Sequence, residues 1–200
     1  IDGTESVTIN GNTCTIIRTT EDWNSFVKKV EEAGGNSGLN AILMNDISIS
    51  QPCGTSEKAP FCGIFYGNGH TLTVNLRDES RQFLAPFSYI KNSSIFDLNV
   101  RGKVYGGRHA AGLVGRAGQT TVNDNFIESC HVSVDVTTTD NYAGGIIGHG
   151  TKSANLIRDC LFDGTITNVV WNVTSYAGAF IGWEENDNYS GYIRNCVERS

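Results

Sequence analysis

Three segments in the second half of the chain carry the same short apolar motif, which begins with alanine and ends with glycine. They are residues 110–115 (AAGLVG), 143–148 (AGGIIG) and 177–182 (AGAFIG). Each is followed by an Ile-x-x-Cys motif, at residues 127–130, 157–160 and 193–196. The closing glycines are 33 and 34 residues apart, and the cysteines are 30 and 36 residues apart. A repeated step of this length is typical of stacked architectures, in which each unit buries its apolar face against its neighbours.

The composition of the repeats indicates which class of repeat protein the chain belongs to. They are rich in Val, Ile, Thr, Gly and Asn and have no helical periodicity, so each unit is expected to consist of short strands and turns. Leucine-rich repeats are shorter, at roughly 20 to 29 residues, and propeller blades are longer, at roughly 40 to 45 residues with a Trp-Asp motif. The sequence therefore predicts an all-β fold, a right-handed parallel β-helix whose successive coils stack about 4.8 Å apart.

Alignment of the repeats places equivalent apolar residues in columns that are expected to point into the coil. One column holds Leu98, Cys130, Cys160 and Cys196, a second holds Val100, Val132 and Phe162, and a third holds Val104, Val136 and Ile166. The first two columns are two residues apart, which is the alternation of a β-strand. The residues between them are therefore expected to face outward; they are Asn99, His131 and Leu161.

The N-terminal part of the chain is expected to cap the coil. Thr20 is a suitable N-cap residue for a helix over about residues 21–34, which the two glycines at 34 and 35 would end. The helix would carry one apolar stripe, formed by Trp23, Phe26, Val27 and Val30. We expect one domain over residues 1–200, with a cap over 1–40 that includes this helix and coils over 41–200. The stripe should cover the otherwise unpaired strand edges of the first coil.

Several motifs together resemble the secreted bacterial β-helix domains with GLUG-type repeats. In this sequence they are Trp23, Asn45-Asp46, the FYGNGHT segment at residues 65–71, the GLVG segment at 112–115 and the IRNC segment at 193–196. The resemblance covers almost the whole chain. It implies a secreted or cell-surface location and a role as an accessory part of a larger surface protein, including some surface peptidases. No catalytic residue set comes with it.

Composition and charge exclude some classes of partner. The formal net charge of the 200 residues is −6 and the Lys and Arg residues are scattered, so the basic stripe of a nucleic-acid-binding protein is missing. No apolar run reaches the roughly 18 residues that a membrane-spanning helix needs. No cofactor is expected, and the isolated domain is expected to be a monomer. Because the chain starts at Ile1 without a signal peptide and stops four residues after Cys196, we expect it to be excised from a longer protein.

The six cysteines are expected to serve two purposes. Cys130, Cys160 and Cys196 share an inward column and are predicted to form a ladder of buried thiols. Zinc binding is the alternative, but no Cys-x-x-Cys or paired-His spacing accompanies them, so no metal is expected. Cys53 and Cys62 bracket a loop with Pro, Gly and Ser residues, and we predict a disulfide bond between them.

Planar side chains flank the repeated glycine motif on both sides and form the best candidate binding site. On one side lie His109, Tyr142 and Tyr176, and on the other Arg116, His149 and Trp183. Stacked coils would present them as two parallel files, a surface suited to stacking on sugar rings. The alternative is that the rings only stack on one another and shield the adjacent glycines.

Catalysis is the rival interpretation, because parallel β-helices also form enzymes that cut polysaccharides. Asp97 and Asp159 occupy one column, two coils apart, and are the weak catalytic candidates of the chain. Residues in such columns also hold turns, and no Arg and Lys cluster or Asp-x-Asp run accompanies them. The sequence therefore favours a non-catalytic β-helical module that acts as a spacer, an adhesion module or a glycan-contact surface. The alternatives are a glycoside hydrolase or lyase, and an accessory domain of a surface peptidase that recognises a host or surface protein.

Overall fold

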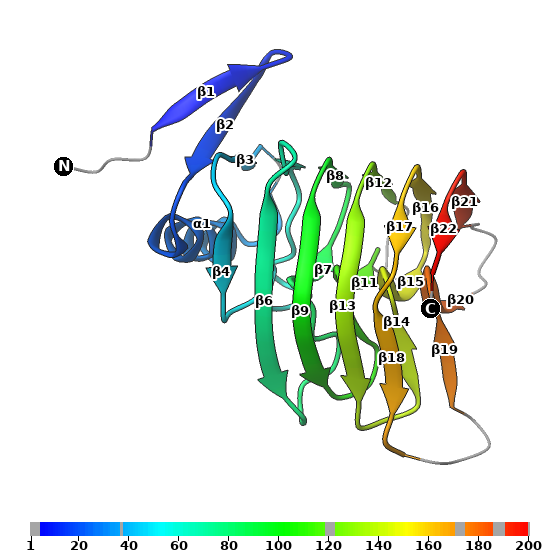
Figure 1. Cartoon of the computed structure of the whole chain (residues 1–200). Helices are drawn as coiled ribbons and strands as arrows, with labels where there is room; N and C mark the ends of the chain where they lie inside the picture. Colours follow the sequence, from blue (N-terminus) through cyan, green and yellow to red (C-terminus); the bar gives the residue numbers. More distant parts are fainter. Residues whose placement is uncertain (1–4, 37, 119–122, 171–174, 186–190, 200) are drawn as a thin grey trace.

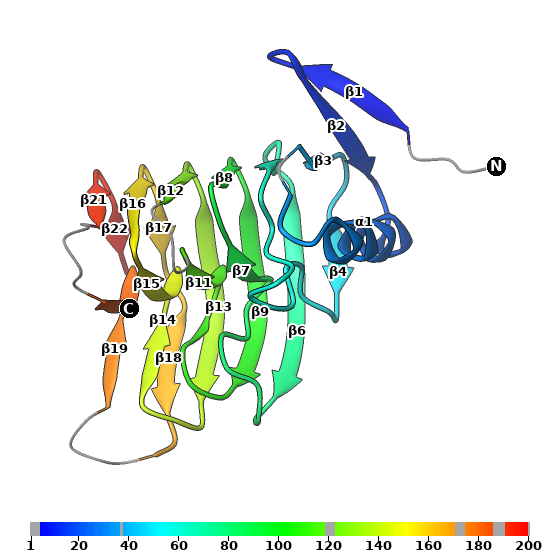
Figure 2. The ribbon, with the colours of Figure 1, turned by 180° about the vertical axis from the view of Figure 1, so that it is seen from behind.

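The chain folds into a right-handed parallel β-helix of about five turns, as the repeat spacing predicts (Figure 1). The computed structural model describes residues 5–36, 38–118, 123–170, 175–185 and 191–199. Successive coils lie side by side, with the N-terminal helix at one end and the last strands at the other, and the view from behind shows the same order (Figure 2).

Four sheets line the coil. The eight-stranded sheet contains β1 (Ser6–Ile9), β2 (Asn12–Ile17), β3 (Asn40–Leu43), β5 (Ile64–Tyr66), β8 (Ser94–Phe96), β12 (Asn123–Glu128), β16 (Ser153–Arg158) and β21 (Tyr192–Arg194). The seven-stranded sheet contains β4 (Ile47–Ile49), β6 (Thr71–Asp78), β9 (Asn99–Gly106), β13 (His131–Thr138), β17 (Leu161–Phe162), β18 (Thr165–Asn168) and β22 (Val197–Glu198). The four-stranded sheet contains β7 (Phe87–Ile90), β11 (Val114–Ala117), β15 (Ile147–Thr151) and β20 (Ile181–Glu185), and the three-stranded sheet contains β10 (Ala110–Ala111), β14 (Tyr142–Gly144) and β19 (Tyr176–Gly178).

The parallel registers confirm the alignment of the repeats. Val132 pairs with Val100 on one side and Phe162 on the other, and Val136 pairs with Val104 and Ile166 in the same way. The intervening His131 pairs with Asn99 and Leu161 on the outward face. Each coil therefore repeats the inward and outward pattern of the coil before it, and the buried columns merge into one continuous core.

Helix α1 (Thr20–Ala33) covers the first coil. All four residues of its predicted apolar stripe are buried, and the ring of Trp23 lies edge-on to those of Phe65 and Phe87, with centroids 6.0 and 5.7 Å away. The predicted N-cap is wrong by one residue. Thr19 caps the helix in a capping box with Asp22, whereas the hydroxyl of Thr20 donates to the carbonyl of Ser48 at 2.8 Å.

A β-hairpin precedes the helix and was not expected from the repeats. Strands β1 and β2 pair antiparallel, and the chain reverses at Asn10 and Gly11, which both have positive φ (49° and 80°). Strand β2 then pairs parallel with β3, so it extends the eight-stranded sheet by one strand. The Asn-Gly pair is the sequence signal for this turn.

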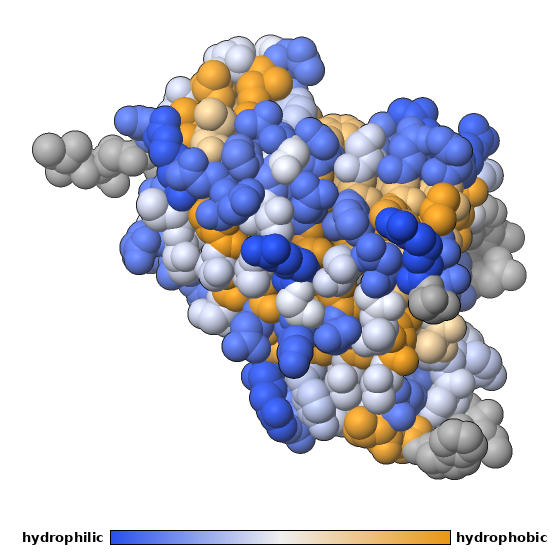
Figure 3. Space-filling model, in the orientation of Figure 1, coloured by the Kyte–Doolittle hydropathy of each residue, from blue (hydrophilic) through white to orange (hydrophobic). Residues whose placement is uncertain are grey.

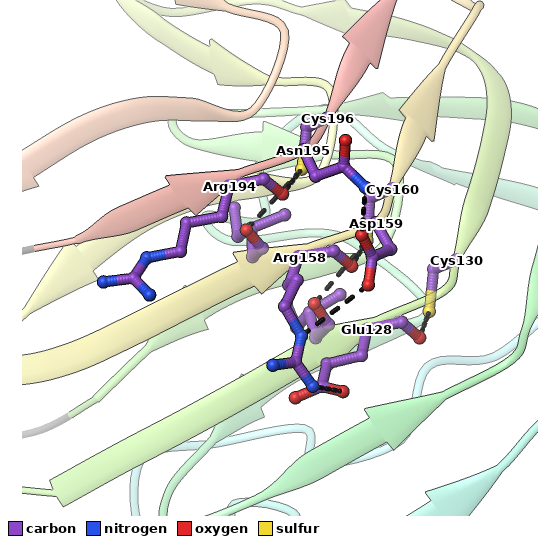
Figure 4. A network of polar contacts seen from close by, with 10 residues as sticks. Glu128, Cys130, Arg158, Asp159, Cys160, Arg194, Asn195 and Cys196 are labelled. Carbon is purple, nitrogen blue, oxygen red and sulfur yellow. Dashed lines mark hydrogen bonds and ion pairs between the residues drawn. The ribbon is translucent and has the colours of Figure 1, made fainter.

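The three cysteines lie in successive corners of the coil as free thiols, of which Cys130 and Cys160 are buried and Cys196 in the last turn is half-buried (Figure 4). The Sγ atoms of Cys130, Cys160 and Cys196 each donate to a backbone carbonyl two residues earlier, at 3.3, 3.2 and 3.1 Å. The contact with Cys160 and burial both raise the pKa of the Cys130 thiol. The three cysteines therefore act as a column of small apolar side chains, and each thiol also forms a hydrogen bond with the backbone at the corner of its own coil.

The predicted disulfide bond between Cys53 and Cys62 is not formed, and both are buried free thiols. Cys53 is fully buried in the core, and its backbone forms a parallel bridge with Phe87. The thiol of Cys62 instead donates to the carbonyl of Pro60 at 3.6 Å. The loop between them is held by backbone pairing: Ser56 bridges Ala59, and Phe61 bridges Ile90.

Within the described ranges, the one helix is too short and too polar to cross a membrane.

Candidate functional site

The six planar residues that the sequence singles out lie in two adjacent columns of the coil. In the three-stranded sheet Tyr142 pairs with Tyr176, and the backbone of His109 bonds to the carbonyl of Tyr142 at 2.8 Å. In the four-stranded sheet Arg116 pairs with His149, which pairs with Trp183. The two sheets adjoin, with β14 and β19 next to β15 and β20 (Figure 1). The structure therefore brings all six into one region.

The rings of the two columns pack against each other as well as along each column. His109 stacks on Tyr142, with centroids 4.7 Å apart, and on His149, with centroids 4.5 Å apart. Tyr142 stacks on Tyr176 at 5.6 Å and lies 5.0 Å from Trp183. The rings thus form one continuous contact from the middle of the coil to its last turn.

Three further side chains complete this group, namely Phe83, Tyr89 and Arg108, and the alignment of the repeats does not identify them. Phe83 stacks on His109 at 5.2 Å and on His149 at 5.8 Å, and Tyr89 meets Phe83 edge-on at 5.3 Å. The guanidinium of Arg108 lies over the ring of Tyr142. The guanidinium of Arg116, which also forms an ion pair with Glu57, lies over the ring of Phe83. We call the whole set the aromatic cluster; it consists of Phe83, Tyr89, His109, Tyr142, His149, Tyr176 and Trp183 with Arg108 and Arg116.

Repeated glycines give the backbone room to place these rings. A Cβ on Gly148 would lie 2.1 Å from the carbonyl oxygen of His109, and one on Gly115 would lie 1.9 Å from that of Phe83. Both Phe83 and His109 have positive φ, at 59° and 61°. A left-handed backbone is unfavourable for bulky residues and is retained only where the surroundings hold it. Two rings of the cluster are therefore held in place at a conformational cost.

Both histidines of the cluster are neutral at pH 7. Burial lowers the pKa of His109 to about 3 and that of His149 to about 4. His109 is 4% exposed, and its Nδ1 lies 3.4 Å from the carbonyl oxygen of Gly148. Neither ring nitrogen of His149 has a hydrogen-bond partner among the described residues. The two imidazoles therefore act as uncharged planar rings.

Charged groups border the cluster. The guanidinium of Arg116 lies 3.5 Å from the carboxylate of Glu57. The carboxylate of Glu185 accepts a hydrogen bond from the hydroxyl of Thr151 at 2.5 Å and lies 3.8 Å from Nε2 of His149. The bond from Thr151 is the main cause that lowers the pKa of Glu185. Arg108 has no such partner within the described ranges.

The cluster is most exposed to solvent in the last turn of the coil. Phe83 and His109 are buried and Tyr142 and His149 are half-buried, whereas Tyr176 is 50% exposed and Trp183 is 38% exposed. These two rings lie 5.8 Å apart at an angle of 54°. They form a platform that packs against the half-buried ring of Tyr142. Large apolar rings with solvent-facing polar atoms are suited to stacking on a ligand.

The weak catalytic candidates do not join this site. Asp97 and Asp159 stand in the corner column before the cysteines, where they, Ser129 and Asn195 all have φ between 50° and 55°. Asp and Asn tolerate this left-handed conformation better than other residues. The carboxylate of Asp159 accepts a hydrogen bond from the side-chain amide of Asn195 and lies 3.7 Å from Nε of Arg158 (Figure 4). Both residues thus form turns at the corner of the coil; the backbone of Asp97 bonds to Gly69 and Glu128 there.

The opposite face of the coil, formed by the seven-stranded sheet, is mainly polar (Figure 3). A groove of about 450 Å³ crosses four strands there, and its polar lining consists of Asn75, Arg77, Lys103, Tyr105, Asp135, Thr137, Thr165 and Thr167. The guanidinium of Arg77 covers the ring of Tyr105 at 4.4 Å and lies 2.6 Å from Glu79. The one aromatic ring of this groove is therefore already occupied.

Among the described residues, no three His, Cys, Asp or Glu side chains are grouped so that they could hold a metal ion. Comparisons of the chain with models of known protein families, with curated proteins and with solved structures found no significant match.

Proposed function

We propose that the chain is a non-catalytic β-helical module of a secreted or cell-surface bacterial protein, and that it contacts glycans through the exposed end of the aromatic cluster. The observation that carries this proposal is the half-exposed pair Tyr176 and Trp183, which packs against the half-buried ring of Tyr142. The GLUG-type motifs noted in the sequence support the location.

The geometry supports contact by stacking better than chemical catalysis. A sugar ring presents one apolar face, which an aromatic platform binds, and a rim of hydroxyl groups, which nearby polar atoms bind. The histidines next to the platform are uncharged, and the two aspartates that were candidates for catalysis lie in turns of left-handed backbone conformation. Scaffolds of stacked coils also act as spacers, which is the function that remains if no glycan binds.

Affinity electrophoresis against a panel of polysaccharides tests the proposal. Trp183→Ala and Tyr176→Ala should each weaken binding about three- to tenfold, because a stacked ring contributes roughly 0.5–1.5 kcal/mol. Tyr192→Ala is the matched control, because Tyr192 is also 50% exposed but lies on β21 of the eight-stranded sheet. If no polysaccharide retards the wild type, or if the control loses as much as the cluster variants, the proposal is wrong.

A further inference from the structure

We propose that the aromatic cluster selects acidic glycans, and that the guanidinium of Arg108 binds the carboxylate or sulfate group of the sugar. This inference rests on the proposed function, because it assigns a ligand class to the same site. Two observations support it: Arg108 lies next to the exposed rings, and the neighbouring Arg116 already has a carboxylate partner, whereas Arg108 has none among the described residues.

Arg108 lies directly at the platform. Its guanidinium carbon is 4.8 Å from the ring centroid of Tyr142, the ring that contacts both Tyr176 and Trp183. A ligand stacked on those two exposed rings would therefore have the guanidinium within reach of its rim. The charge of Arg108 also contributes to the lowered pKa values of His109 and His149, which places it within electrostatic reach of both columns.

Among the described residues, Arg108 is the cation of the cluster without an anionic partner. Arg116 forms an ion pair with Glu57, and its side chain is only 17% exposed. The described ranges provide no carboxylate within ion-pair distance of Arg108, and its buried Nε, like that of Arg116, has no acceptor there. A guanidinium that is partly removed from water without an acceptor is unfavourable, and an anion that binds there restores the missing hydrogen bonds.

The chemistry of the guanidinium specifies the kind of anion. Its fork of N–H donors matches the two oxygens of a carboxylate or sulfate, and it is charged at any pH at which the protein is folded. An acidic sugar unites this group with a ring that stacks on Tyr176 and Trp183. Because the whole chain carries a net charge of −6, general attraction would not retain a polyanion, so any retention has to come from a local site.

The test compares two probes that differ only in charge. Polygalacturonate and its fully methyl-esterified form have the same backbone, but only the first carries carboxylates. Wild-type protein should bind polygalacturonate at least tenfold more tightly at low salt, and Arg108→Gln should remove this preference, a loss of roughly ten- to hundredfold for a charge-assisted pair. Arg108→Lys should restore part of it, because it keeps the charge but loses the fork.

Arg101→Gln is the matched control. Arg101 lies on β9 of the seven-stranded sheet and bonds through Nε to the hydroxyl of Thr73 at 3.2 Å, so its loss removes one surface charge far from the cluster in the fold. It should leave the preference unchanged. Circular dichroism and thermal unfolding show whether each variant remains folded.

The outcomes separate this inference from the proposed function. Equal binding of both probes, with no effect of Arg108→Gln, overturns the acidic preference and leaves glycan contact standing. Loss of the preference in Arg101→Gln alone also overturns the inference, because the anion then binds the polar face of the seven-stranded sheet. Absence of binding to every polysaccharide refutes the proposed function and this inference with it.

Discussion

Glu184 lies on the inward side of strand β20, and its burial makes a prediction about stability and pH. A Cβ on Gly150 would lie 2.3 Å from one carboxylate oxygen of Glu184 and 2.9 Å from the side-chain nitrogen of Asn155. Among the described residues, neither carboxylate oxygen of Glu184 nor that nitrogen has a hydrogen-bond partner. Burial raises the pKa of Glu184 from 4.5 to about 7. Below about pH 7 the folded protein therefore holds a protonated carboxyl group in the last described coil.

The sign of the effect follows from where the proton is bound. Between pH 4.5 and about 7 the folded chain keeps the proton of Glu184 and the unfolded chain releases it. The free energy of unfolding is therefore highest below pH 4.5 and falls as the pH rises through 7. The full difference corresponds to about 3 kcal/mol, or roughly 2 kcal/mol once the partial exposure of the side chain is taken into account.

Glu184→Gln should remove this dependence. Urea unfolding of wild type and variant at pH 5, 6, 7 and 8 measures the difference, and the variant should gain roughly 2 kcal/mol relative to wild type across the series. Glu185→Gln is the control with the opposite sign, because the pKa of the neighbouring, outward-facing Glu185 is lowered by its bond from Thr151. A difference between wild type and Glu184→Gln that stays constant from pH 5 to 8 would refute the reasoning.

Three further predictions concern stability and the thiols. Gly148→Ala should cost about 3 kcal/mol or more in urea unfolding, because the new Cβ meets two backbone oxygens, 2.1 Å from His109 and 2.9 Å from Gly115; a loss under about 1 kcal/mol contradicts the tight packing. His109→Phe should weaken the fall of Tm between pH 6.5 and 5. In the wild type the pKa of His109 is lowered, so the free energy of unfolding decreases by about 1.4 kcal/mol for each pH unit as the pH falls. An unchanged dependence of Tm on pH shows that the imidazole is not buried as described. Alkylation of the unfolded protein without reductant should label all six cysteines by intact mass, since all are free; four labels would indicate that Cys53 and Cys62 are bridged after all.

The repeat spacing was sufficient to predict the β-helix and much of its detail. A period of thirty-odd residues fixes which residues meet in neighbouring coils, so the columns of Val132 and Val136 and the thiol ladder followed directly. The apolar stripe was sufficient to predict the helix, and only its N-cap residue was wrong. Thr19 and Thr20 are chemically the same, and which of them caps the helix depends on the bond from Thr20 to Ser48 in the next coil.

The candidate site was predicted in part. The periodic members of the aromatic cluster could be found because they repeat, and the structure brings all six of them together. Phe83 and Arg108 stand outside the repeat and enter the cluster through loop conformations with positive φ at Phe83 and His109. The missing disulfide has a similar cause, because distance along the chain between Cys53 and Cys62 says nothing about which way each side chain turns.

The placement of α1 gives the stack of coils a direction. One end is closed by a helix whose apolar stripe is already buried, while at the other end β20, β21 and β22 each pair, within the described part of the chain, with a strand on one side only. To lengthen the β-helix, whole units of thirty-odd residues would therefore be inserted after β22 or between existing coils. Each unit would lengthen the β-helix by about 4.8 Å without disturbing the capping helix α1.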